Sequence, residues 1–331
     1  MPKPDKLLRL AVLVGLTPPD LLIRSDAITP VVAFRKKGAA KTTERHIARA
    51  QQMGAMLRPL VAHLPFDEFV KPPSLKSPST DYSYLQSLVS SVRKEIGVGP
   101  DSPIDFPHLI KRFQDTQTVL VPVLWGHKGH HENALHIFLP DSTTTWVFLN
   151  LDVEIHDFKF WMAHELGHVL APELRGDAAE DFADAFAGAL LLPEAAVKET
   201  YECIISLSNA GLQINKIKDV AEKFLISPLG VYMQVNSFAK HNSLPQVQLE
   251  PAIYGASKNL SKNYHCVSEA LFSDQPVVAK ELVKFCREEL NSPFFEALGS
   301  YLRSSNKGAG FVQSVLDIPA IDAIAIQQEI A

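Results

Sequence analysis

Two histidines four residues apart, His164 and His168, enclose a glutamate in the string His-Glu-Leu-Gly-His. On a helix, residues at this spacing project from one face about one turn apart. Two neutral imidazole nitrogens placed in this way can bind one divalent metal ion, usually zinc. Glu165 lies beside the first histidine, where its carboxylate could accept a proton from a water at the metal. The string therefore indicates metal-assisted hydrolysis as the candidate chemistry.

The residues around the string predict a buried helix. Residues 158–170 contain no proline and carry apolar residues on most sides. Unpaired polar groups are costly to bury, so the two histidines and the glutamate need partners. Metal ligation by the histidines, with Glu165 bonded to the water, would satisfy all three side chains. The alternative is a pair of histidines hydrogen-bonded within an ordinary core.

A hydrolytic zinc site has three protein ligands and leaves a fourth position for water. Pro172 and Gly176 interrupt the first helix, and a second helix is predicted to begin near Asp177. The short turn would bring this second helix back across the first. Glu180 is therefore the predicted third ligand, and Asp184, one turn later, is predicted to hold a ligand in place.

Two alternatives to this assignment remain open. Asp177 and Glu180 have the spacing of a capping box, in which the glutamate would only cap its own helix. Glu173, in the turn before this helix, is the nearest rival as a third ligand. The second helix also carries small residues that would allow close approach to the first: Ala183, Ala187 and Gly188.

The double motif resembles that of the ImmA/IrrE-type metallopeptidase family. The matching stretches are His-Glu-Leu-Gly-His-Val-Leu at 164–170, Glu-x-x-Ala-Asp-x-Phe-Ala at 180–187 and Leu-Leu-Leu-Pro at 190–193. The resemblance implies that His164, His168 and Glu180 hold the metal and that Glu165 is the catalytic base. The family more often has asparagine at the position of Asp184, a departure that leaves the ligands unchanged.

Three short runs rich in β-branched and aromatic residues predict strands before the metal helix, namely 118–125, 134–139 and 145–150. Pro122 places the first of these at a sheet edge or at a bulge. The family similarly has a small sheet before its metal helix. The predicted fold class is therefore α+β, with a small sheet packed on a zincin-like helical core. An open sheet edge beside the metal would suit an extended peptide, which can add as a strand.

The loop at 126–133 carries His127, His130 and His131. These side chains could bind a second metal or stabilise an oxyanion, but a solvated loop is the favoured interpretation because no rigid element fixes their spacing. Tyr201, beyond the second helix, is the one other candidate for an oxyanion stabiliser. The sequence pattern assigns the oxyanion role neither to the loop histidines nor to Tyr201.

The chain divides into four predicted regions. A helical N-terminal segment at 1–65 precedes a Pro/Ser-rich linker at 66–80, a metallopeptidase domain at 81–240 and a helical C-terminal domain at 241–331, a candidate sensor. Residues 1–30 resemble the last helices of a repressor-type helix-turn-helix and are interpreted as a packing remnant. Further helices are predicted at 42–64, 82–96, 106–113, 215–225, 227–239, 277–290 and 293–303.

Composition favours a soluble protein over a membrane protein or a dedicated nucleic-acid binder. The chain of 331 residues is 46% hydrophobic and 21% charged, which is ordinary for globular proteins. The first 60 residues hold 11 Lys/Arg against 4 Asp/Glu, so contact with DNA there is an open alternative. The three cysteines, without C-x-x-C spacing, are interpreted as reduced thiols and indicate the cytoplasm: Cys203, Cys266 and Cys286.

The resemblance implies a regulatory endopeptidase that cleaves one specific protein, a helix-turn-helix repressor or antitoxin. The implied metal is zinc, although a His-His-Glu site also accepts manganese or another divalent ion. A second function class stays open, in which a metal-containing regulatory protein acts through protein or DNA contacts without proteolysis. Glu165 argues against that class, because a structural metal site requires no base beside its ligands.

Overall fold

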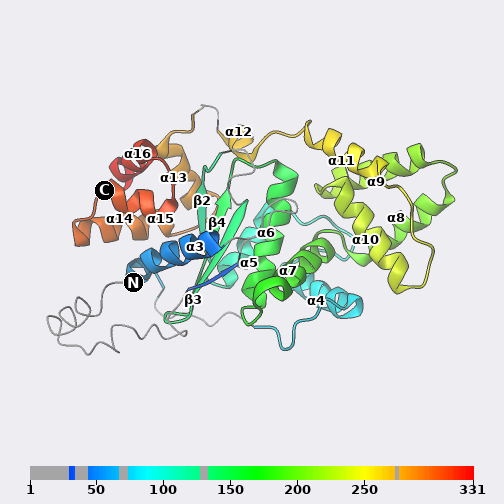
Figure 1. Cartoon of the computed structure of the whole chain (residues 1–331), viewed down its shortest axis with the longest axis horizontal. Coiled ribbons are helices and arrows are strands. Elements are labelled where there is room, and N and C mark those ends of the chain that lie inside the picture. Colours follow the sequence, from blue (N-terminus) through cyan, green and yellow to red (C-terminus); the bar gives the residue numbers. More distant parts are fainter. Residues whose placement is uncertain (1–29, 34–43, 67–73, 127–132, 273–275) are drawn as a thin grey trace.

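The computed structural model describes residues 30–33, 44–66, 74–126, 133–272 and 276–331. These residues form an α+β fold in which a small mixed sheet lies among many helices (Figure 1). The predicted fold class is confirmed. The N-terminal segment that resembles a helix-turn-helix, the loop with His127, His130 and His131, and residues 67–73 of the linker lie outside the described residues. The four region boundaries predicted from the sequence stay predictions.

The sheet has four strands in the order β1-β3-β4-β2. Strand β3 pairs antiparallel with both β1 and β4, while β2 runs parallel to β4. The strands are β1 (Val31–Ala33), β2 (Val119–Val123), β3 (Ala134–Leu139) and β4 (Thr144–Asn150). The three predicted strands are confirmed, and β1 is an addition that the sequence did not predict. Its three residues are too few for a readable alternation, and only pairing with β3 makes them a strand.

Strand β2, which contains Pro122, forms one edge of the sheet, as its proline predicts. This edge is covered rather than open. The Leu120 carbonyl accepts a hydrogen bond of 2.5 Å from the Ser292 hydroxyl, and every residue of the strand is buried. At the other side of the sheet, β1 pairs with β3 over residues 136–138. These positions are occupied, and the expectation that a peptide adds to an open edge beside the metal site stays a prediction for the rest of the sheet edge.

The predicted helices are found with small shifts at their ends. The predicted helix at 42–64 divides into α3 (Glu44–Leu57) and a 3₁₀ helix, η2 (Arg58–His63), with a proline in the first turn of η2. A helix not predicted from the sequence, α8 (Glu194–Ser206), follows Pro193. The remaining helices before the C-terminal region are α4 (Tyr82–Glu95), α5 (Phe106–Asp115), α6 (Ile155–Leu170), α7 (Gly176–Leu191), α9 (Ala210–Phe224) and α10 (Pro228–His241).

Helices α6 and α7 pack closely against each other at Gly167. A Cβ atom on Gly167 would lie 3.0 Å from the Cα of Ala183, so the hydrogen side chain permits this approach. The prediction of small residues at the interface is therefore confirmed for Ala183. Gly188 has a different role, because a Cβ there would lie 2.2 Å from the Nε2 atom of Gln234 on α10. It accommodates α10 and does not face α6.

Two buried cations tie these helices to their surroundings. The Lys159 ammonium on α6 donates a 2.7 Å hydrogen bond to the carbonyl of Phe224, the last residue of α9. The Arg93 guanidinium on α4 donates a 2.8 Å bond to the carbonyl of Leu190, in the last turn of α7. Both bonds place positive charge at a helix C-terminus, where unpaired carbonyls and the helix dipole favour it. The two bonds join α6 to the end of α9 and the end of α7 to α4, so they hold both helices of the candidate site in place.

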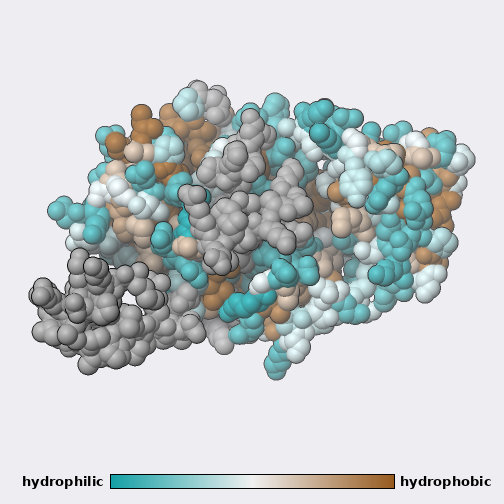
Figure 2. All heavy atoms as spheres, viewed as in Figure 1, coloured by the Kyte–Doolittle hydropathy of each residue, from teal (hydrophilic) through white to brown (hydrophobic). Residues whose placement is uncertain are grey.

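The C-terminal region is helical, as predicted, and contains α11 (Ala252–Ser261), α12 (Val267–Leu271), α13 (Ala279–Glu288), α14 (Phe294–Ser305), α15 (Ala309–Leu316) and α16 (Ala320–Ile330). In Figure 1, α13 to α16 group on one side of the sheet and α8 to α11 on the other. Figure 2 shows an apolar surface over the α13 and α16 region, where Ile321 and Ile324 are exposed.

Within the described residues, no individual helix combines the length and apolar composition needed to cross a membrane. Helices α15 and α16 meet that test only together, across a bend of 115°.

Candidate active site

The HExxH helix and the returning helix bring three candidate ligands together. His164 and His168 project from α6, and Glu180 projects from the second turn of α7. One ligand atom from each side chain can be chosen so that all three lie within 4.8 Å of one another. The structure therefore gathers the three residues that the sequence predicted as metal ligands.

The distances within this cluster fit a small divalent ion. The Nε2 atoms of His164 and His168 lie 3.0 Å apart, and each is 3.5 Å from a carboxylate oxygen of Glu180. Ligand atoms about 2.0–2.1 Å from a tetrahedral ion are separated by roughly 3.3 Å, close to the spacing seen here. Two imidazole nitrogens and one carboxylate oxygen form a donor set that suits zinc, and other divalent ions also accept it.

Asp184 orients the first histidine. Its Oδ1 atom lies 2.9 Å from Nδ1 of His164, so the imidazole donates its Nδ1–H to the carboxylate. That tautomer leaves the lone pair of Nε2 directed toward His168 and Glu180. Asp184, one helical turn after Glu180, therefore contacts a candidate ligand, as the sequence predicted.

The two alternatives for Glu180 are not what the structure shows. Helix α7 begins at Gly176 with Arg175 in the N-cap position and has no side-chain cap, so Asp177 and Glu180 do not form a capping box. Glu173 is exposed in the turn between the helices and is outside the ligand cluster. Among the described acidic residues, Glu180 is the one that joins the two histidines.

Glu165 is buried beside this cluster without a hydrogen-bond partner. Its side chain is 1% exposed, and neither carboxylate oxygen has a partner among the described residues. Burial, and secondarily the charge of Glu180, raise the pKa of Glu165 well above its ordinary value. An ordinary core would satisfy such a group. The metal interpretation accounts for it, because a water or substrate at the metal would bond this carboxylate, whereas two core histidines would leave it unsatisfied.

His168 is held in its neutral form. Burial, followed by the neighbouring His164, lowers the pKa of His168 to about 3, although Glu180 acts in the opposite direction. A neutral imidazole keeps a lone pair for a metal ion. This electrostatic setting agrees with a ligand role and would disfavour a histidine that is paired as a cation.

A third histidine lies at the site, and the sequence did not predict it there. His136 is on β3, is 3% exposed, and its ring centroid is 5.6 Å from that of His168. Burial, followed by the neighbouring His168, lowers the pKa of His136 well below its ordinary value. The only signal in the sequence was one histidine within an otherwise apolar strand, Ala-Leu-His-Ile-Phe-Leu. That pattern alone does not distinguish a site residue from a core residue.

Tyr201, considered as an oxyanion stabiliser, is engaged elsewhere. Its hydroxyl donates a 2.9 Å hydrogen bond to the Pro245 carbonyl, and its ring packs against Phe238 on α10. The tyrosine therefore braces α8 against the segment after α10. The structure gives no support to a catalytic role for it.

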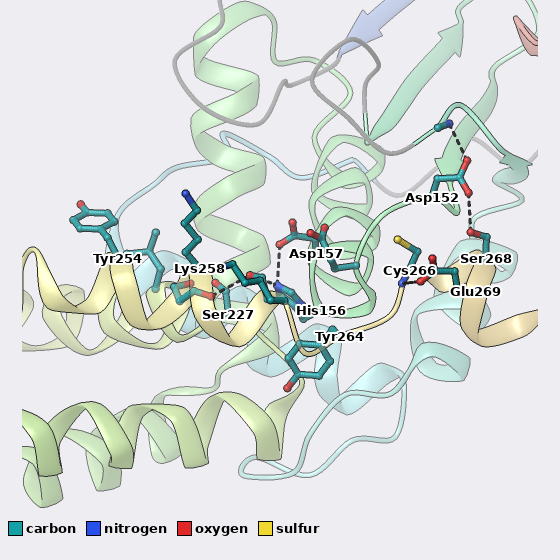
Figure 3. A pocket seen from close by; sticks show the side chains of 16 residues that line it. Asp152, His156, Asp157, Ser227, Tyr254, Lys258, Tyr264, Cys266, Ser268 and Glu269 are labelled. Atoms are coloured by element: carbon teal, nitrogen blue, oxygen red, sulfur yellow. Dashed lines mark hydrogen bonds and ion pairs between the residues drawn. The ribbon is translucent and has the colours of Figure 1, made fainter.

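A separate cavity of about 1060 Å³ opens beside the N-terminal end of α6 (Figure 3). Its walls come from the start of α6 and from α11 and α12, and none of the three candidate ligands lines it. Asp152 fixes one end, where its carboxylate accepts hydrogen bonds of 2.8 Å from the Gly126 amide and 2.7 Å from the Ser268 hydroxyl. Lys258 of α11 and Asp157 of α6 give the cavity both signs of charge. It is a polar feature distinct from the metal cluster.

A His-Glu-x-x-His helix followed by a glutamate on a returning helix is an arrangement that metal-dependent peptidases use. Residues 126–227 match the Peptidase_M78 family, described as the IrrE N-terminal-like domain. The match spans strands β3 and β4 and helices α6 to α9, and it includes all four candidate site residues. It confirms the family resemblance found in the sequence and supports a metallopeptidase-type regulatory function with a divalent metal. No curated protein matches the chain.

Proposed function

We propose that this protein is a metal-dependent regulatory endopeptidase of the HExxH type with a glutamate as third ligand. The observation that carries the proposal is the cluster of His164, His168 and Glu180 beside the buried, unpartnered carboxylate of Glu165. Zinc is the proposed metal, with manganese or another divalent ion as the alternative. The ion would polarise the scissile carbonyl and make a bound water more acidic.

Glu165 has the position and environment of a general base. As the water oxygen bonds to the carbonyl carbon, its proton passes to the Glu165 carboxylate. The same proton then moves to the leaving nitrogen as the C–N bond breaks, so the carboxylate is regenerated and no other reactant is needed. Asp184 keeps His164 in the ligand tautomer throughout.

The proposed substrate is one specific protein, a helix-turn-helix repressor or antitoxin. Two observations support narrow specificity of this kind. The family match is to a domain of the IrrE type, and the side chains of His164, Glu165 and His168 are all at most 4% exposed. With these three side chains buried and Glu180 only 21% exposed, a substrate segment must fit a restricted opening, which disfavours broad digestion.

The competing function is a regulatory protein that keeps a structural metal and cuts nothing. The burial of Glu165 disfavours it, because a closed structural site would gain nothing from a carboxylate without a partner. The two functions make different predictions for one substitution, Glu165→Gln.

The test pairs metal content with cleavage for the wild type, Glu165→Gln and the matched control Glu173→Gln. Candidate substrates are helix-turn-helix proteins from neighbouring genes, incubated with each zinc-loaded protein. We expect all three proteins to bind about one metal ion, and cleavage by the wild type and Glu173→Gln only, with at least a roughly 1000-fold loss in Glu165→Gln. Metal binding without cleavage of any candidate by any of the three would favour the non-proteolytic alternative.

A further inference from the structure

His136 is the second buried polar side chain at this site that lacks a hydrogen-bond partner. Neither of its ring nitrogens is bonded among the described residues, and both are shielded from solvent. A buried polar group in this condition costs about 1–3 kcal/mol relative to one that is satisfied. Apolar residues fill the rest of β3, and leucine or phenylalanine would fit the strand without this cost. We therefore expect the imidazole of His136 to bond a group that is not one of the described protein residues.

The position of His136 indicates where its partner lies. Its backbone pairs with Val147 on β4 and with Ala33 on β1, so strands flank it on both sides. Its ring faces α6, with the ring centroid of His168 5.6 Å away and the two planes inclined by 41°. No hydrogen bond joins the two rings. The compartment bounded by β3 and α6 is the one that contains the candidate ligands.

We propose that His136 donates a hydrogen bond to the oxygen of the scissile carbonyl as that oxygen becomes an oxyanion. An imidazole carries at least one ring N–H in either protonation state, so a donor is always present. Donors fixed in a buried site before the reaction are effective because they need no reorganisation when charge develops. This inference rests on the proposed function and assigns the oxyanion stabiliser that the sequence left unassigned.

The bond changes are simple. Addition of water converts the C=O double bond to a C–O⁻ single bond, and the ring N–H of His136 faces the new charge. Glu165 holds the proton from the water meanwhile. When the C–N bond breaks, the carbonyl re-forms and the proton passes to the amine. His136 neither gains nor loses a proton.

Arg175 is the nearest rival for this role, because its charge acts on His136. Its guanidinium is bonded within its own turn, however, where it donates to the carbonyls of Pro172 and Leu174. The side chain is exposed, and one of its Nη atoms makes both of these local contacts. His136 is buried and has its donor unused, which favours it over the arginine.

The test compares two small probes on zinc-loaded protein by calorimetry. N-phosphoryl-leucinamide carries tetrahedral phosphoryl oxygens in the place of the oxyanion, whereas imidazole binds the metal and has no oxygen. The variants are His136→Phe, which keeps a ring and removes the donor, and His136→Gln, which keeps an N–H. His136→Leu replaces the phenylalanine variant if the larger ring prevents folding, as judged by circular dichroism.

For His136→Phe we expect binding of the phosphoryl probe to weaken about 10- to 100-fold, as for loss of one hydrogen bond to a charged group. For His136→Gln we expect a loss of about fivefold or less. Imidazole binding and zinc content should change by less than about twofold in both. Unchanged phosphoryl binding in His136→Phe, or equal weakening of both probes, would overturn the inference. Because binding of the probes does not require turnover, this outcome is separate from failure of the cleavage test.

Discussion

Two pairs of buried polar side chains in the described part of this protein differ in their hydrogen-bond partners. Lys159 on α6 and Arg93 on α4 are almost fully buried, and both donate to backbone carbonyls at the ends of other helices. At the metal cluster, Glu165 and His136 are equally buried, yet their polar atoms have no partner in the described part of the chain. In the first group, Lys159 Nζ and both Nη atoms of Arg93 have carbonyl partners, and Arg93 Nε has none among the described residues. The polar atoms of Glu165 and His136 would gain hydrogen-bond partners only when a ligand or substrate binds at the site.

This difference distinguishes buried polar groups that stabilise the fold from buried polar groups that serve a function. A satisfied buried cation holds elements together, and its loss should lower stability. An unsatisfied buried group lowers stability as it stands, and it persists because of what it does when a ligand or substrate is present. Substitution of Arg93, with its three carbonyl partners, and substitution of Glu165 should therefore change the free energy of unfolding in opposite directions.

Arg93→Leu should give the largest loss of stability. Its two Nη atoms donate to three carbonyls, those of Leu190, Gly99 and Ser102. Loss of these bonds should lower the free energy of unfolding by about 3 kcal/mol or more. Denaturant titration measures this, with Lys94→Met, a substitution of the exposed neighbouring residue, as the control. Equal midpoints for the two variants would contradict the structural role of Arg93.

Lys159 should make stability depend on pH in the alkaline range. Burial lowers its pKa from 10.5 to about 8 in the folded protein, so the folded state binds fewer protons than the unfolded state between these values. The free energy of unfolding of the wild type should therefore rise, relative to Lys159→Met, by up to about 3 kcal/mol from pH 8 to 10.5. Parallel pH profiles for the two proteins would show that the lysine has an ordinary pKa.

Glu165→Gln should stabilise the metal-free protein. This change in the free energy of unfolding is opposite in sign to that of Arg93→Leu and is the smallest of the three predicted effects. The pKa of Glu165 is raised in the folded state, so its cost to stability appears as pH rises above the unfolded value near 4.5. Replacement by the neutral isostere should add about 1–2 kcal/mol at pH 7 in the presence of a chelator, and little at pH 4. Glu173→Gln, at an exposed position, should change stability by less than about 0.5 kcal/mol. Destabilisation by Glu165→Gln at pH 7 would remove the distinction between the two groups.

Local patterns in the sequence were sufficient for the elements around the site. The apolar run 134–139 has the bounds of β3, and the His-Glu-x-x-His string lies on α6 as its spacing requires. Breakers at Pro172 and Gly176 gave the turn that returns α7 across α6. The start of α10, predicted at residue 227, carries a serine cap, because Ser227 accepts a 3.0 Å hydrogen bond from the Gly230 amide. In each case the signal lies within about one helical turn or one strand.

Features that depend on distant partners were not predictable. Strand β1 exists only through its pairing with β3, more than 100 residues later, and three residues carry no period of their own. His136 is the one histidine of strand β3, and Lys159 is the one lysine of helix α6. Their importance comes from burial and from His168 and Phe224, which the fold brings to them. The covering of β2 by Ser292 is of the same kind.

The most direct test of the central claim is X-ray absorption at the zinc edge of the zinc-loaded protein, with binding affinity measured for the wild type and Glu180→Ala. The account predicts one zinc ion bound by two imidazole nitrogens and a carboxylate oxygen, with no sulfur ligand, at distances near 2.0–2.2 Å. It also predicts that Glu180→Ala weakens binding at least about 100-fold. A sulfur ligand, or an unchanged affinity in Glu180→Ala, would contradict the assignment of His164, His168 and Glu180 as the metal site.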